Sequence, residues 1–249
     1  MPLRLLLLQA REPGDPVRYE ERLAFAQKTR LPLEAIDTHD LLQGPPSWRR
    51  VWTYDALLVG GSGRFNISDG SLPHLEETLD FMRQVVAEGF PMFASCFGFQ
   101  LLVAAMGGTI VRDEARAEVG TFRICLTPEG QQDELFSRLP VCFQAQLGHK
   151  ERVEVWPASL LHLASSERSR YQALRVPGKP IWATQFHPEL DRETNLKRFQ
   201  RYKALYIQTF GEQGYRAILA RFQESPHTEV LLPGFLQQVF GPRYSAKGG

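Results

Sequence analysis

The sequence has few cysteines, no long apolar run and no excess of charge of either sign. Its three cysteines, Cys96, Cys125 and Cys142, are too few and too scattered for a disulfide scaffold or a zinc knuckle. An odd number of cysteines also fits a reducing compartment. The longest early apolar run, residues 5–8, is shorter than a signal-peptide core and far shorter than a membrane span. We therefore expect a soluble, cytoplasmic protein.

The charges of the chain are almost balanced. Lysine and arginine together number 29 and aspartate and glutamate 28, so the net charge is +1. This balance argues against a basic nucleic-acid surface and against an acidic disordered chain. Hydrophobic residues make up 43% of the 249 positions, an ordinary value for a globular protein that buries a full core without disulfides. We expect no binding to nucleic acid or to membranes.

The first two-thirds of the chain alternate short apolar runs with helical patterns. This order indicates a mostly parallel sheet with helices on both faces. For one of the helices, Ser71 is the expected N-cap and Gly89 the expected end. The pattern predicts strands over residues 4–9, 34–37, 55–59 and 91–94, and helices over 17–29, 72–86 and 97–106.

After Gly107 the pattern becomes more typical of antiparallel strands, with helices at the end. Expected here are strands within 109–126 and 141–156, a short helix over 133–139, a hairpin over 171–186, and helices from 191, over 213–223 and over 232–240. We predict an α/β three-layer sandwich of the flavodoxin-like type, with a small antiparallel sheet and C-terminal helices. Residues 1–209 form the main domain, and 210–249 a helical extension with a disordered tail.

A single cysteine marks the most informative segment. Cys96 lies between the strand at 91–94 and the helix that begins at Phe97. A strand that enters a helix through a tight turn of small residues is typical of a nucleophile elbow, and the helix N-terminus favours the thiolate. The alternative is a buried structural cysteine, the usual environment of a free cysteine.

A base for this nucleophile is present in the segment Gln185-Phe186-His187-Pro188-Glu189, at the end of a predicted strand. His187 is suited to accept a proton, and Glu189 to orient its imidazole. The alternative is a surface histidine beside an exposed acid. A metal site is less expected, because no third ligand lies nearby in the sequence.

The glycines Gly60 and Gly61 end another predicted strand, where backbone N–H groups can point at a developing oxyanion. The alternative is an ordinary turn between a strand and a loop. The segment lacks both the dinucleotide-binding spacing and the lysine of a P-loop, so it does not indicate a nucleotide site.

The three motifs, in this order, resemble those of the class I (triad) glutamine amidotransferases, and most of all the stand-alone members similar to the amidotransferase domain of GMP synthase. The resemblance extends over about residues 3–203. It implies the fold of that family, and hydrolysis of the side-chain amide of glutamine or of a γ-glutamyl amide through a γ-glutamyl thioester, with release of ammonia and no metal or organic cofactor. The implied residues are Cys96, His187 and Glu189 as the triad, Gly61 and Phe97 as the oxyanion hole, and Gln100, Gly60 and His149 at the substrate.

Two residues depart from the family pattern. Ala94 stands where the family usually has glycine, and Ser62 follows the two glycines where proline is frequent. Without the proline, residues 63–70 are candidates for a lid over the site.

The acceptor of the ammonia is not evident from the sequence. Only about 40 residues follow the shared region, too few for a synthase domain. Three alternatives stay open: a partner protein that acts as a separate synthase subunit, a stand-alone hydrolase of γ-glutamyl peptides, and a binding module with weak catalysis. A homo-oligomer is equally compatible with the sequence.

The elbow leads to a prediction about thiol reactivity. Cys96 should react with an alkylating reagent faster than Cys125 or Cys142, because neither of these lies at a strand-to-helix turn. Mass spectrometry after a short exposure to iodoacetamide measures the three rates. Faster modification of Cys125 or Cys142 would contradict the expected environment of Cys96.

Overall fold

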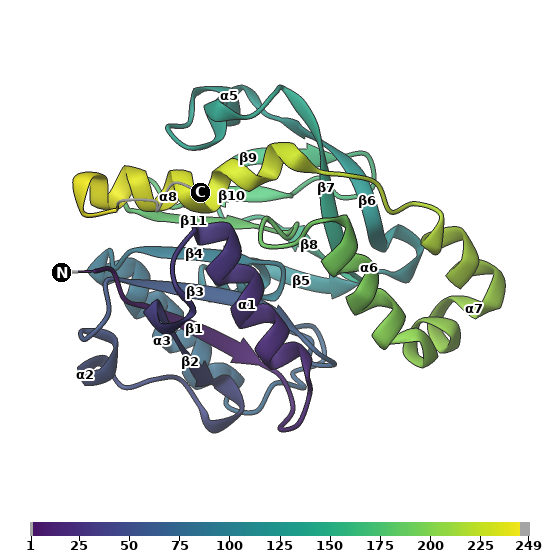
Figure 1. Ribbon diagram of the computed structural model, residues 1–249, viewed down its shortest axis with the longest axis horizontal. Coiled ribbons are helices and arrows are strands. Elements are labelled where there is room, and N and C mark those ends of the chain that lie inside the picture. Colours follow the sequence, from purple (N-terminus) through teal and green to yellow (C-terminus); the bar gives the residue numbers. More distant parts are fainter. Residues whose placement is uncertain (1, 245–249) are drawn as a thin grey trace.

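A computed structural model describes residues 2–244 of the chain (Figure 1). A large twisted sheet runs through the molecule, with helices on both of its faces. The disorder predicted for the last five residues concerns 245–249, which lie outside the described residues. No helix between residues 2 and 244 is long and apolar enough to cross a membrane.

The large sheet has nine strands within the described residues, in the order β2-β1-β3-β4-β11-β10-β9-β6-β7. The strands from β2 to β11 pair in parallel, and those from β11 to β7 pair antiparallel. Their bounds are β1 (Leu5–Ala10), β2 (Ile36–Asp40), β3 (Ala56–Ser62), β4 (Met92–Ser95), β6 (Glu118–Leu126), β7 (Cys142–His149), β9 (Leu161–Ser166), β10 (Ala173–Arg175) and β11 (Ile181–Thr184). A separate antiparallel pair consists of β5 (Thr109–Arg112) and β8 (Glu151–Val155).

The α-helices are α1 (Val17–Thr29), α2 (Trp48–Val51), α3 (Leu75–Glu88), α4 (Phe97–Ala105), α5 (Pro128–Gln132), α6 (Arg192–Arg201), α7 (Lys203–Leu219) and α8 (Leu231–Phe240). Short 3₁₀ helices lie at 33–35, 41–43, 114–116, 136–138, 226–230 and 241–243.

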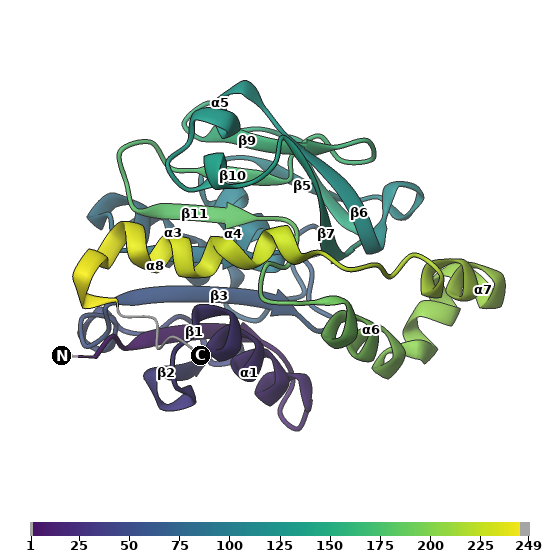
Figure 2. The same cartoon turned by 45° about the horizontal axis from the view of Figure 1, so that its top comes forward.

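The side chains of β1 show how the layers form, because successive residues of a strand point to opposite faces. Leu6 and Leu8 pack in the core shared with α3 and α4, whereas Leu5 and Leu7 pack in the core shared with α1 and α8. Figure 2 shows α8 lying along the sheet on the side of α1, with α3 and α4 behind the sheet. The predicted three-layer α/β sandwich is confirmed.

Two local predictions differ from the structure for reasons of capping. The short helix expected over 133–139 is a 3₁₀ helix at Phe136–Arg138, and a separate helix, α5, precedes it, starting where the Thr127 side chain accepts a hydrogen bond from the N–H of Gly130. The helix α3 begins at Leu75 rather than after Ser71, because His74 has a left-handed conformation with φ of 57°. Its end at Gly89 is as predicted.

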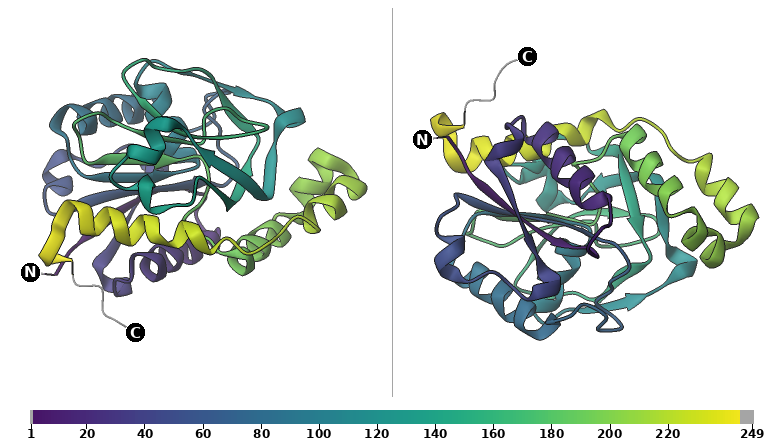
Figure 3. Two further views of the ribbon diagram at one scale, coloured as in Figure 1. Left: turned by 90° about the horizontal axis from the view of Figure 1, so that it is seen from above. Right: turned by 60° about the horizontal axis from the view of Figure 1, so that its bottom comes forward.

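The C-terminal helices occupy two positions. The helix α8 packs on the sheet, where the ring of Phe235 lies 5.8 Å from that of Phe93 and 6.0 Å from that of Trp182. The helix α7 projects from one side of the molecule (Figure 3) and loses its helical geometry at Gly211, where φ is 70°. The domain boundary expected at 209/210 falls next to this break, and the division itself stays a prediction.

Two cysteines form a disulfide that the sequence analysis did not expect. Cys125 and Cys142 are 17 residues apart, but the antiparallel pairing of β6 with β7 places them directly opposite, with 4.1 Å between their Cα atoms. Cys96 is the free cysteine of the described chain. The odd number of cysteines is therefore no argument for a reducing compartment, because strand pairing and not the count decides which thiols meet.

The position of α8 predicts the effect of a core substitution. Phe235→Ala should lower the free energy of unfolding by about 3–5 kcal/mol, because it leaves a cavity between α8 and the sheet. Urea denaturation followed by circular dichroism measures this, with the exposed Gln237→Ala on the same helix as the matched control. Equal stability of the two variants would contradict the packing of α8 on the core.

Candidate active site

Cys96 occupies a strained turn between β4 and α4. Its φ is 52° and its ψ is −100°, a combination that non-glycine residues rarely adopt. Its N–H donates a hydrogen bond of 2.7 Å to the carbonyl oxygen of Thr184, at the end of β11. This bond holds the turn against the sheet, and the side chain, 9% exposed, lies at the N-terminus of α4.

The close approach of β4 and α4 depends on a glycine near the start of the helix. A Cβ atom added to Gly98 would lie 2.7 Å from the Cβ of Val59 and 3.0 Å from the Cβ of Ala94. Ala94, at the position of the family glycine, has a methyl group that needs space. The absence of a side chain at Gly98 leaves room for this methyl group.

His187 and Glu189 form a buried pair beside the cysteine. The Nδ1 atom of His187 lies 2.6 Å from Oε1 of Glu189, and both side chains are almost fully buried. Burial alone would lower the pKa of His187, but the charges of Glu189 and of the Cys96 sulfur outweigh burial and raise the pKa to about 9. The ring is therefore suited to hold a proton next to a thiolate.

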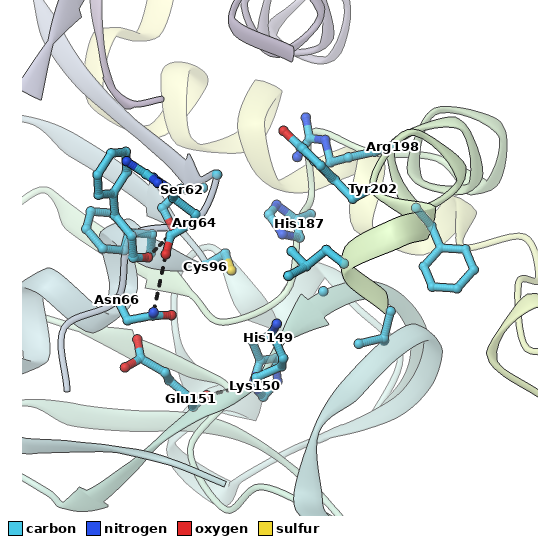
Figure 4. Close-up of a pocket in the computed structure, with 18 of the residues that line it drawn as sticks. Ser62, Arg64, Asn66, Cys96, His149, Lys150, Glu151, His187, Arg198 and Tyr202 are labelled. Carbon is cyan, nitrogen blue, oxygen red and sulfur yellow. Dashed lines mark hydrogen bonds between the residues drawn. The ribbon is translucent and has the colours of Figure 1, made fainter. Parts of the chain in front are cut away.

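One cavity brings most of the predicted residues together (Figure 4). The predicted site residues that line it are Gly61, Cys96, Phe97, Gln100, His149 and His187. Glu189 does not line the cavity but contacts the His187 ring at its Nδ1 atom. Gly60 does not belong to the lining: a Cβ atom there would lie 2.6 Å from Cδ of Glu21, so Gly60 provides room for that carboxylate.

The N–H of Gly61, expected in the oxyanion hole, donates to Oε1 of Glu21 at 3.1 Å. This N–H is therefore occupied in the structure, and its role at an oxyanion stays a prediction that requires the peptide to turn. Phe97 is the first residue of α4, so its N–H has no acceptor within the helix and remains suited to an oxyanion.

Glu21 belongs to a buried ion pair that sequence reasoning missed. Its carboxylate lies 3.0 Å from Nη2 of Arg11 and accepts a second bond from Gln9 at 2.9 Å. Burial would raise the pKa of Glu21, but the guanidinium groups of Arg11 and Arg198 outweigh burial and hold it below its usual range. The available signal was a polar pair, Gln9 and Arg11, at the carboxyl end of an apolar strand.

The ring nitrogens of His149 are occupied by acceptors of the protein. Nδ1 lies 2.8 Å from the carbonyl oxygen of Glu151, and Nε2 lies 3.1 Å from the buried carboxylate of Glu118. The Nε2 amide group of Gln100 donates to the carbonyl oxygen of Glu151 and to Gln185. Substrate binding by His149 and by Gln100 stays a prediction. Because both ring nitrogens of His149 already have protein partners, only the backbone of His149 is available to a substrate.

The loop proposed as a lid is tied to the far side of the cavity. The N–H groups of Ile67 and Ser68 donate to the two carboxylate oxygens of Glu151, at 3.1 and 2.8 Å. Residues 63–66, at the start of this loop, line the cavity. The loop thus forms part of the cavity wall and is held in this position by Glu151.

The third wall of the cavity comes from α6 and α7 and was not predicted. Arg198, Tyr202 and Tyr206 line it. Burial and the nearby Cys96 sulfur raise the pKa of Tyr206 to about 12. The sequence predicts a helix from residue 191, but its pattern does not distinguish these three side chains from those of any other helix. No group of three side chains suited to hold a metal ion occurs among the described residues.

Comparison with known proteins gives a consistent result. Residues 43–204 match the family described as Glutamine amidotransferase class-I. A glutamine-hydrolyzing GMP synthase of Desulfotalea psychrophila is 33% identical over 135 residues, which cover 53% of this chain and 24% of that protein. One of the subunits of the glutamine-hydrolyzing GMP synthase of Methanococcus aeolicus is 30% identical over 131 residues, which cover 51% of this chain and 68% of that protein. The chain therefore spans about a quarter of the Desulfotalea protein.

Solved structures share the fold over nearly the whole chain. A glutamine amidotransferase of Thermotoga maritima has a TM-score of 0.74 at 18% identity, covering 96% of this chain and 98% of its own. A glutamine amidotransferase of Methylobacillus flagellatus has a TM-score of 0.67 at 17% identity, covering 100% and 98%.

The buried His187–Glu189 pair predicts a pH titration. An NMR titration of the His187 ring should give a pKa near 9, and Glu189→Gln should lower it by removing the negative charge. Because the pKa is raised above 6.5, the stabilisation that His187 gains is complete below pH 6.5 and is lost as the pH rises through about 9. Comparison with His187→Gln identifies the signal, and a wild-type pKa near 6.5 would contradict the pairing.

Proposed function

The chain belongs to the class I glutamine amidotransferase family, and from this we propose that it hydrolyses the side-chain amide of glutamine with Cys96 as nucleophile. His187 is the general base and acid, and Glu189 orients it. The observation that carries the proposal is the 2.6 Å contact between His187 and Glu189 next to the free thiol of Cys96, in one cavity.

The reaction proceeds in two steps. The Cys96 thiolate attacks the carbon of the amide, and His187 gives its proton to the departing nitrogen, so that ammonia leaves and a γ-glutamyl thioester remains. Water then attacks the thioester, His187 accepts a proton from it, and glutamate leaves as the thiolate is restored. The raised pKa of His187 keeps the proton available for the first step.

The oxyanion of each step lies at the N-terminus of α4. The Phe97 N–H, at the first residue of α4, has no acceptor within the helix and is available there, and one such donor is worth about 3 kcal/mol in the transition state. Gly61 supplies a second donor when its peptide turns from Glu21 toward the cavity. Its lack of a side chain matters for this, because a Cβ atom there would lie 3.2 Å from Cε1 of His187.

We also propose that the ammonia is accepted by a separate synthase subunit. The support is the similarity to proteins of Methanocaldococcus jannaschii and Methanococcus aeolicus, each named as one of the subunits of a glutamine-hydrolyzing GMP synthase. In this arrangement the cavity described above supplies ammonia, and a second protein uses it.

The triad predicts the result of a substitution at the nucleophile. Cys96→Ser should reduce the release of glutamate from glutamine by about 10⁴-fold or more, since the hydroxyl is far less ionised than the thiol. A coupled glutamate dehydrogenase assay measures the rate, and mass spectrometry detects the thioester in the unchanged protein.

The matched controls concern histidine. His187→Gln should abolish turnover, whereas His227→Gln, at an exposed position outside the cavity, should retain it. Glutamine hydrolysis that survives in Cys96→Ser would rule out the proposed nucleophile.

A further inference from the structure

Arg198 presents a guanidinium group to the catalytic cavity without an acceptor. It lies on α6 and lines the cavity, and its Nη1 atom is enclosed and has no hydrogen-bond partner within the described chain. No carboxylate of residues 2–244 lies within 4.0 Å of it as an ion-pair partner. The side chain as a whole is partly exposed, but an enclosed N–H donor without an acceptor is unfavourable, and a ligand anion would satisfy it.

The neighbouring carboxylates are committed to other donors. Glu21 accepts from Arg11, Gln9 and the Gly61 N–H. Asp15 accepts from the hydroxyl of Tyr202 at 2.7 Å and from a backbone N–H. Neither is therefore a substitute for the missing acceptor of Arg198.

Most other cations around the cavity have a carboxylate of their own. Arg11 is paired with Glu21, and the remaining pairs at the lining are Arg64 with Glu12 at 2.7 Å and Arg112 with Glu114 at 2.5 Å. Lys150, the lysine of the cavity lining, resembles Arg198 in this respect: no carboxylate of the described residues lies within 4.0 Å of its ammonium group.

Arg198 lies on the same side of the nucleophile as His187. In Figure 4, His187 lies between Cys96 and Arg198, whereas the Lys150 ammonium lies over the ring of Tyr206, 6.0 Å from its centre. His187 must protonate the departing nitrogen, so the leaving group is on the side of His187 and Arg198.

We propose that the cavity takes γ-glutamyl amides whose leaving amine carries a carboxylate, such as γ-glutamyl amino acids, and that Arg198 binds this carboxylate. The inference rests on the proposed function only for its nucleophile and base, because with such a substrate an amino acid leaves instead of the ammonia that a synthase subunit would use. The bond from carbon to the Cys96 sulfur forms as the carbon–nitrogen bond breaks, and His187 protonates the amine of the released amino acid. Water then replaces the sulfur and releases glutamate, so no further reactant is needed.

A pair of matched substrates tests the role of Arg198. γ-Glutamyl-glycine and γ-glutamyl-glycinamide differ only in the charge of the leaving group. The wild-type protein should hydrolyse γ-glutamyl-glycine with a kcat/KM about 10- to 100-fold higher, mainly through a lower KM, as expected for a hydrogen bond between charged groups. In Arg198→Gln the ratio should fall to about one, and Arg198→Lys should restore part of it.

The control variant is Arg201→Gln, which removes the same charge from the same helix. Arg201 pairs with Glu20 and lies outside the cavity lining, so the variant should keep the wild-type ratio. If Arg198→Gln proves unstable, binding of the two compounds to Cys96→Ser and to Cys96→Ser/Arg198→Lys measures the same preference without turnover.

The outcomes separate the two proposals. If the wild-type protein hydrolyses glutamine but shows no preference for γ-glutamyl-glycine, or if Arg198→Gln keeps the preference, the assignment of Arg198 is wrong and the triad stands. If no compound of the series, glutamine included, yields glutamate or a thioester on Cys96, both proposals are wrong.

Discussion

The parallel pairing of β4 with β11 is the constraint on which the site depends. The pairing places Ser95 opposite Thr184, and the next N–H, that of Cys96, bonds to the Thr184 carbonyl oxygen. His187 follows three residues after Thr184 and is held by a bond from its own N–H to Gln146 in β7. A shift of this register would move the thiol away from the imidazole, because Cys96 directly follows β4 and His187 closely follows β11, so the pairing of these two strands sets the distance between the two side chains.

The site is built around two buried carboxylates with different partners. Glu189 faces the imidazole of His187 and favours its protonated form beside the Cys96 sulfur. Glu21 faces Arg11 and takes the N–H of Gly61. The first arrangement holds a proton beside the Cys96 sulfur, whereas the second keeps the Gly61 N–H, the proposed oxyanion donor, bound to a carboxylate. In the structure, the pair proposed for proton transfer is therefore formed while this proposed donor is occupied.

The wall formed by α6 and α7 gives the cavity its particular chemistry. Directly after Glu189 the chain enters α6, whose start is fixed by mutual hydrogen bonds between Asp191 and Thr194. This start sets which side chains of the helix face the cavity, and among them is Arg198. The family fold accounts for the positions of Cys96 and His187 in one cavity, and the helix that follows adds Arg198 to the wall of that cavity.

The sequence by itself determined the order of strands and helices and the layered architecture, and it supplied the candidates for nucleophile, base and orienting acid. Local patterns carry this information, because apolar periodicity, a cysteine at a strand-to-helix turn and a histidine two residues before an acid all lie within short segments. Only the tertiary structure decided that Cys125 meets Cys142, that the Gly61 N–H is bound to Glu21, and that Arg198 reaches the cavity without a partner. Each of these depends on strand register or on the rotation of a helix about its axis, which contacts between distant segments set and local sequence does not.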